Sequence, residues 1–261
     1  MADNKKIVIY HLYRHDDTSL FLHPFADSDK SLDYFENVEI IGKYGIEPRV
    51  EAFTMFRNEL YRVIEDRVNS WVSEVRFLPK FLISAGVFLF SYLFFALVVR
   101  DPLPLIDELA IGVGISLIVF FLLGRRDRRS DLSLKKRVAL RSVVDKIVFR
   151  EDPFIKEVES ALQSIETVDQ NDMVEKMFNP LKTPLTEEEK EDAERLTKYL
   201  KKRFKSRELK RKEKMVSRLP KSKEGGRSSK ILSLLMENKK TDLPLFAVYT
   251  RIKKSFERVD S

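Results

Sequence analysis

The sequence predicts a mainly α-helical integral membrane protein: a two-helix transmembrane hairpin with cytoplasmic amphipathic helices and a possible small β element near the N-terminus. Two uncharged or nearly uncharged apolar runs predict the hairpin, and an uneven distribution of Lys and Arg orients it. The 261-residue chain is 43% hydrophobic and 34% charged, and its mean hydropathy of −0.28 alone would indicate a soluble protein. That average conceals the two runs, because the charged residues are concentrated elsewhere.

The first 48 residues are expected to form a small cytoplasmic α/β or β region. Residues 6–10, 20–24 and 38–41 are short runs rich in β-branched and aromatic residues, which favour strands. Gly42 and Gly45 follow the third run as turn signals. Three strands of this length predict a small sheet.

Residues 49–79 are predicted to form an amphipathic cytoplasmic helix that leads into the membrane. Apolar residues recur there at three- and four-residue steps, as one face of a helix requires. The stripe consists of Phe53, Phe56, Leu60, Val63 or Ile64, Val68, Trp71, Val75 and Leu78. Pro79 is tolerated at the start of the helix that follows.

Residues 80–124 are predicted to form the transmembrane hairpin, with spans at 81–99 and 105–124. Each span holds thirteen Leu, Ile, Val or Phe residues, and the first has no charge. A helix of this length measures about 28–30 Å, which matches the hydrocarbon core of a bilayer. The five-residue link contains Pro102 and Pro104, which end the first helix and make the two antiparallel neighbours. A hairpin that dips into one leaflet and returns is the alternative.

Basic residues flank the hairpin on one side. Eight follow the second run between Arg125 and Arg141, and three precede the first, whereas the link carries Arg100 alone. Because Lys and Arg are retained on the cytoplasmic side, we expect both termini in the cytoplasm. The first residues do not have the pattern of a targeting peptide, and we therefore favour a bacterial plasma (inner) membrane.

Small residues allow membrane helices to approach closely. The candidates for helix packing are Gly86, Ala110, Gly112, Gly114 and Ser116. We expect these faces to meet within one chain. A seam between chains of a homo-oligomer is the alternative.

Residues 125–185 are predicted to contain two cytoplasmic helices. The apolar positions 134, 138, 143, 144 and 147 indicate the first, and Asp152-Pro153 is an N-cap and first-turn proline for the second. We expect the helix before the hairpin to pack on these two as a bundle, with a coiled coil between chains as the alternative.

Residues 186–219 are predicted to form one basic helix that begins at a capping box, Thr186 with Glu189. Residues 190–230 carry a net charge of +11, whereas the whole chain carries +7. Contact with anionic lipid and a solvated helix without a partner are equally favoured, and contact with RNA is less favoured. The expected contact residues are Lys201, Lys202, Arg203, Lys205, Arg207, Lys210, Arg211 and Lys212. Residues 220–261 are expected to be a flexible link and short helices at 229–237 and after Asp242.

The sequence favours no enzyme, cofactor or metal site. The chain has no Cys, which excludes thiolate chemistry, and it contains no phosphate-binding glycine motif. His11 and His15 have the spacing of a helical metal site, but on the predicted strand they would lie about 13 Å apart.

We therefore expect a non-enzymatic, membrane-anchored interaction or scaffold module that binds an unidentified cytoplasmic protein partner. Asp107 and Glu108 begin the second span, and in an oligomer they could line a pore mouth. The first alternative is thus a cation channel or transporter component. The second alternative is a membrane tether for RNA or ribosomes.

Overall fold

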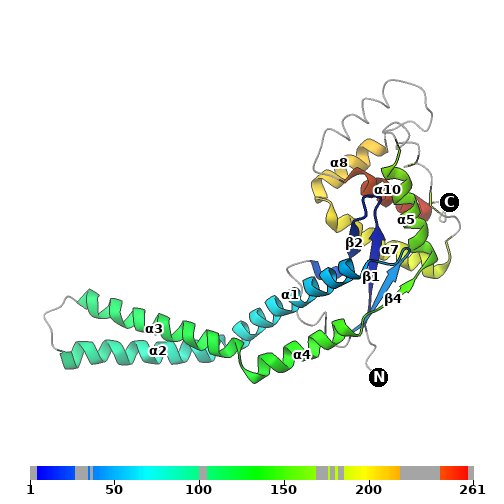
Figure 1. Cartoon of the computed structure of the whole chain (residues 1–261). Coiled ribbons are helices and arrows are strands. Elements are labelled where there is room, and N and C mark those ends of the chain that lie inside the picture. Colours follow the sequence, from blue (N-terminus) through cyan, green and yellow to red (C-terminus); the bar gives the residue numbers. More distant parts are fainter. Residues whose placement is uncertain are drawn as a thin grey trace. The chain divides into compact units, whose positions relative to one another are not determined.

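The computed structural model describes residues 5–26, 35, 38–99, 105–168, 176, 180–181, 185–217 and 242–257. It is mainly helical with one four-stranded mixed sheet (Figure 1). The chain divides into two compact units. The α/β unit comprises Met1–Asp27, Glu39–Phe56 and Ile147–Ser261, and the hairpin unit comprises Ser28–Val38 and Arg57–Lys146.

The sheet has the strand order β2-β1-β3-β4. Its strands are β1 (Lys5–Tyr13), β2 (Ser19–Leu22), β3 (Val38–Tyr44) and β4 (Val148–Glu151). β1 and β2 are antiparallel, with Tyr10 opposite Leu22, whereas β3 and β4 are parallel, with Ile41 opposite Val148. The three predicted strands are confirmed. β4 was not predicted, and it joins the end of the chain that follows the hairpin to the strands that precede it.

Gly42 lies within β3 rather than in a turn. A Cβ atom at this position would lie 2.4 Å from the ring of Phe149 on the neighbouring strand β4. Phe149 is part of an aromatic cluster that also contains Phe21, Phe53 and Phe56. Glycine at position 42 therefore leaves room for this cluster, which covers one face of the sheet with the first two turns of α1 (Val50–Val75).

The opposite face of the sheet packs against helices from the second half of the chain. These are α5 (Pro153–Glu166), α7 (Glu187–Arg203), α8 (Ser206–Val216) and α10 (Leu243–Glu257). Their apolar stripes and the inward residues of β1 form one buried core, with Tyr10, Leu12, Phe154, Leu162, Leu196, Leu200 and Phe246 at most 2% exposed. A short 3₁₀ helix, η1 (Pro24–Ala26), follows β2.

The predicted helix starts are confirmed. The side chain of Asp152 accepts hydrogen bonds from the main-chain N–H groups of Phe154 and Ile155, and Thr186 forms the capping box with Glu189. The single helix predicted over 186–219 is instead two helices. The chain leaves the helical conformation at Phe204, whose ring is buried against Phe246 and Tyr249. The predicted helix at 229–237 lies outside the described residues.

The hairpin unit contains most of α1, then α2 (Phe77–Phe94) with a π-helical turn η3 (Phe95–Val99), α3 (Leu105–Arg128) and α4 (Asp131–Asp145). α1 contacts α4, as predicted: Glu65 forms ion pairs with Arg137 and Arg141 at 2.8 and 2.7 Å. The predicted bundle goes no further, because α5 packs against β1 and α10 in the α/β unit.

Candidate membrane anchor and polar clusters

Two helices of the hairpin unit are long and apolar enough to cross a membrane: Phe77–Leu97 and Glu108–Arg128. They contact each other, but only 17% of the first and 11% of the second is buried. Their exposed side chains include Phe81, Leu82, Leu89, Phe90, Leu93, Leu117, Ile118, Phe121 and Leu122. Soluble proteins rarely expose an apolar surface of this kind, whereas lipid would cover it. Both helices coincide with the predicted runs.

The contact between α2 and α3 depends on small residues. The hydroxyl of Ser116 donates a hydrogen bond to the main-chain oxygen of Ser84, at 2.9 Å. A Cβ atom on Gly112 would lie 3.3 Å from the ring of Phe88, so glycine allows a close approach there. Gly112 and Ser116 thus lie at the helix–helix contact that the sequence predicted.

Three other small residues do not lie at this contact. Gly86 and Ala110 are exposed, and Cβ atoms added at Gly86 or Gly114 would meet nothing within 4 Å. The reason is helical geometry: Ala110 and Gly114 lie on a different side of α3 from Gly112 and Ser116. The expectation that all five pack within one chain is corrected for these three. A role for them between chains stays a prediction.

Lys80 is nearly buried at the start of the first apolar helix, with 6% of its surface exposed. Its ammonium nitrogen lies 5.5 Å from the centre of the Phe120 ring on α3. In the sequence, this lysine is only one of the charges that flank the first apolar run. The aromatic contact lets its stem cover apolar surface while the charge stays near the helix end.

The two acids proposed for a pore mouth lie in the first turn of α3. Glu108 is half-buried, and the side chain of Asp107 lies outside the described residues. A pore therefore stays a prediction.

Seven of the eight basic residues expected to contact lipid or RNA are exposed, and they lie at the end of α7 and in the first part of α8. Lys201, Lys202, Arg203, Lys205, Arg207, Lys210 and Arg211 are exposed. Lys212 is 3% exposed, and its ammonium lies 5.9 Å from the centre of the Phe246 ring. The expectation that Lys212 contacts lipid or RNA is corrected, because the opposite faces of α7 and α8 pack into the core and Lys212 lies on that side.

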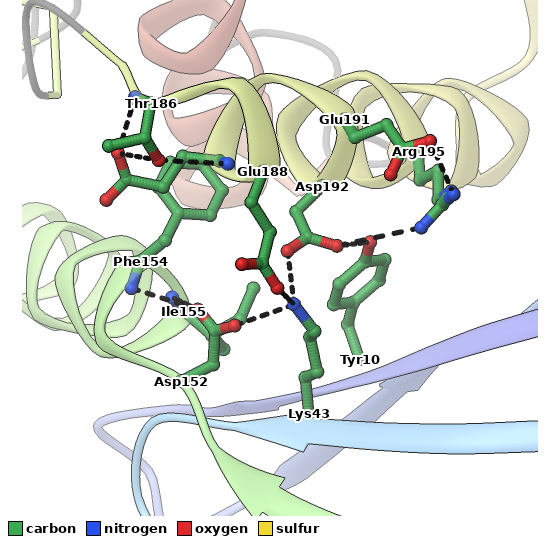
Figure 2. Close-up of polar contacts among 11 residues, drawn as sticks. Tyr10, Lys43, Asp152, Phe154, Ile155, Thr186, Glu188, Glu191, Asp192 and Arg195 are labelled. Atoms are coloured by element: carbon green, nitrogen blue, oxygen red, sulfur yellow. Dashed lines mark hydrogen bonds and ion pairs between the residues drawn. The ribbon is translucent and has the colours of Figure 1, made fainter.

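A charged cluster joins α5 and α7 to the sheet (Figure 2). The ammonium of Lys43 on β3 forms ion pairs with Asp152 at 2.9 Å and with Asp192 on α7. The hydroxyl of Tyr10 on β1 donates to Asp192 at 2.8 Å, and Glu188 lies 3.5 Å from Lys43 on the solvent side. No sequence pattern predicts the cluster, because its members lie on four separate elements.

The electrostatics of Lys43 indicate a structural role. Burial disfavours its charge, but hydrogen bonds and attraction from Asp192 and Asp152 outweigh that effect and raise its pKa to about 12. A lysine that acts as a base or nucleophile needs a lowered pKa instead. The cluster therefore fixes α7 over the ends of β3 and β4.

Glu159 on α5 is fully buried and binds the main chain of two other segments. It accepts hydrogen bonds from the N–H groups of Tyr13 at 2.9 Å and Ile46 at 2.6 Å. Burial raises the pKa of Glu159 to about 7, even though these N–H groups favour the carboxylate. Burial also lowers the pKa of the adjacent His11 to about 4, so this histidine is neutral at pH 7.

Across the described part of the chain, no three His, Asp or Glu residues are placed to hold a metal ion together. No protein-family model, curated protein or solved structure matches this chain.

Proposed function

We propose that this protein is a two-span membrane protein whose hairpin anchors the α/β unit at the cytoplasmic surface, where that unit acts as an interaction or scaffold module. The observation that supports the proposal is the exposed apolar surface of Phe77–Leu97 and Glu108–Arg128, which their mutual contact leaves mostly uncovered. Burying such a surface in lipid gains roughly 25 cal/mol per Å². Lipid would therefore remove the free-energy cost of exposing this surface to water.

The charges at the helix ends support the orientation. Three arginines (Arg125, Arg126 and Arg128) occupy the last turn of α3. Since basic residues of this kind stay on the cytoplasmic side, the α/β unit, which lies outside the spans on both sides of the sequence, is cytoplasmic.

The construction of the α/β unit supports a binding role. Its central charged cluster is occupied by internal ion pairs, and seven of its exposed basic residues lie between Lys201 and Arg211, at the end of α7 and in the first part of α8. An exposed basic face attracts an acidic partner or an anionic surface over a distance of about 8–10 Å at physiological salt. We propose that this face meets the partner.

Single-cysteine labelling tests the anchor directly, because the natural chain has no Cys to remove. Leu103→Cys in the link and Lys210→Cys on α8 are expressed separately in intact cells and treated with a membrane-impermeant maleimide. We expect labelling at position 103 from outside, and at position 210 only after the membrane is opened. Labelling of position 103 only from the inside, or a chain that stays soluble without detergent, would refute the proposal.

A further inference from the structure

We propose that the cytoplasmic end of the hairpin is a binding pocket for the phosphate of an anionic phospholipid headgroup. The inference rests on the membrane anchor proposed above and names a ligand for it. The pocket has a volume of about 820 Å³, within the range of small-molecule sites. Its basic residues are Arg76, Arg125, Arg126 and Arg129.

Three segments bring these arginines together. Arg76 lies between the end of α1 and the start of α2. Arg125 and Arg126 are in the last turn of α3, and Arg129 is in the turn that leads into α4. The antiparallel hairpin thus joins charges that are about fifty residues apart in the sequence.

The four guanidinium groups have no ion-pair or hydrogen-bond partner among the described side chains. Arg137 and Arg141, farther along α4, are paired with Glu65 on α1. The same basic stretch therefore contains arginines that hold α1 against α4 and arginines with no such use. Asp127 and Asp131 also line the pocket, which leaves a formal excess of two positive charges.

The chemistry of the pocket matches a phosphodiester at the membrane interface. One guanidinium group can bind two phosphate oxygens at the same time. Several arginines around one pocket therefore favour an anion with several acceptor oxygens. Arg76 directly precedes the first apolar helix, and Arg125 lies in the last turn of the second. With the hairpin in a membrane, the pocket therefore lies where the hydrocarbon core gives way to headgroups. Leu123 forms part of its wall, and an apolar wall suits the glycerol and first methylene groups of a lipid better than a free phosphate ion.

The test is lipid binding by the full chain in a non-ionic detergent. Phosphatidylglycerol or phosphatidylcholine is added, and bound lipid is counted by native mass spectrometry. We expect at least roughly tenfold preference for phosphatidylglycerol, which the combined substitution Arg125→Gln, Arg126→Gln and Arg129→Gln removes. The matched control, Arg62→Gln, Lys146→Gln and Arg150→Gln, is placed at exposed positions outside the pocket and outside α7 and α8. It removes the same charge and keeps the preference.

Further measurements distinguish a lipid headgroup from free phosphate, and paired hydrogen bonds from charge alone. Substitution of the three pocket arginines by Lys retains the charge but not the paired hydrogen bonds, and we expect it to weaken the preference severalfold; it also serves if the Gln variant does not fold. The inference is overturned if the pocket variant still prefers phosphatidylglycerol, if the control loses as much, or if millimolar inorganic phosphate displaces the lipid. Labelling at Leu103→Cys in each variant reports the anchor separately, so that either claim can fail alone.

Discussion

The hydroxyl of Ser116 on α3 donates a hydrogen bond to the main-chain oxygen of Ser84 on α2, at 2.9 Å. It is a side-chain bond between the two apolar helices, and it lies one turn from the close approach at Gly112. We expect Ser116→Ala to destabilise the packing of α2 on α3 by about 0.6 kcal/mol, the usual value for such bonds in membrane proteins. Reversible unfolding in mixed micelles measures it, and a loss above about 2 kcal/mol would show that more than this bond is involved.

Gly112 and Gly114 form a matched pair for testing how the hairpin packs. Gly112→Leu would force α3 away from Phe88 and is expected to destabilise the hairpin by about 1–3 kcal/mol. Gly114→Leu projects into open space and is expected to change little. The measurement is again unfolding in micelles. Equal losses for the two variants would contradict the assigned face, and a loss at Gly114 that depends on protein concentration would reveal a seam between chains.

Asp192 is expected to contribute strongly to the stability of the α/β unit. Asp192→Ala leaves the buried hydroxyl of Tyr10 without its acceptor and removes one carboxylate from Lys43, at a cost of about 3 kcal/mol. The control is Glu188→Ala, because that side chain is 84% exposed and should matter little. Hydrogen exchange of the β1 amides measures both. Similar exchange rates in the two variants would show that the charged cluster does not stabilise β1.

Lys212 offers a substitution that stabilises the protein. Burial lowers the pKa of this lysine, and its ammonium has no hydrogen-bond partner among the described residues. Lys212→Met retains the volume without the buried charge, so we expect a gain of about 1 kcal/mol in the free energy of unfolding. The exposed neighbour Lys210→Met should leave stability unchanged. Destabilisation by Lys212→Met would show that the ammonium is satisfied in solution.

Glu159 and His11 should have opposite effects on stability as the pH changes. The pKa of Glu159 is raised to about 7, so its contribution is present below pH 4.5 and is lost as the pH rises through 7. The pKa of His11 is lowered to about 4, so its contribution is present above pH 6.5 and is lost as the pH falls through 4. Between pH 4.5 and 6.5 the two trends oppose each other.

Single variants separate the two trends. Glu159→Gln should become less stable as acid is added, whereas His11→Gln should become less stable as the pH rises from 4.5 to 7. Chemical unfolding of the full chain at several pH values, followed by exchange of the β1 amides, measures the slopes. Parallel slopes in the two variants would contradict the assigned pKa directions.

The sequence predicts the elements with strong local signals and misses those defined by distant partners. The two apolar runs, the cap at Asp152 and the capping box at Thr186 are local, and the structure confirms them as helices and helix starts. Strand β4 has only four residues, and its partner is β3, so no local periodicity marked it. The break at Phe204 has a visible signal: a large aromatic residue in a run of charges, which the core buries.

The candidate sites show the same division. Arg125 and Arg126 were recognised as charges that orient the hairpin, but their convergence with Arg76 depends on the joint between α1 and α2 meeting the end of α3. Gly112 and Gly114 looked equivalent in the sequence, and only the helix–helix contact distinguishes them. From the sequence, Lys212 could not be distinguished from its exposed neighbours. Only the tertiary packing determines which side of α8 faces the core.

The sheet is assembled from both ends of the chain. β1, β2 and β3 precede the apolar helices, whereas β4 and the covering helices α5, α7 and α10 follow them. During synthesis, the first strands therefore leave the ribosome without their hydrophobic cover. The sheet and its core can be completed only after both apolar helices have been synthesised. For example, Tyr10 on β1 bonds to Asp192, which follows it by 182 residues. A ribosome stalled before residue 148 would hold the first strands without β4 and without the covering helices. Protection of β1 from proteases would therefore report that the polypeptide has been completed.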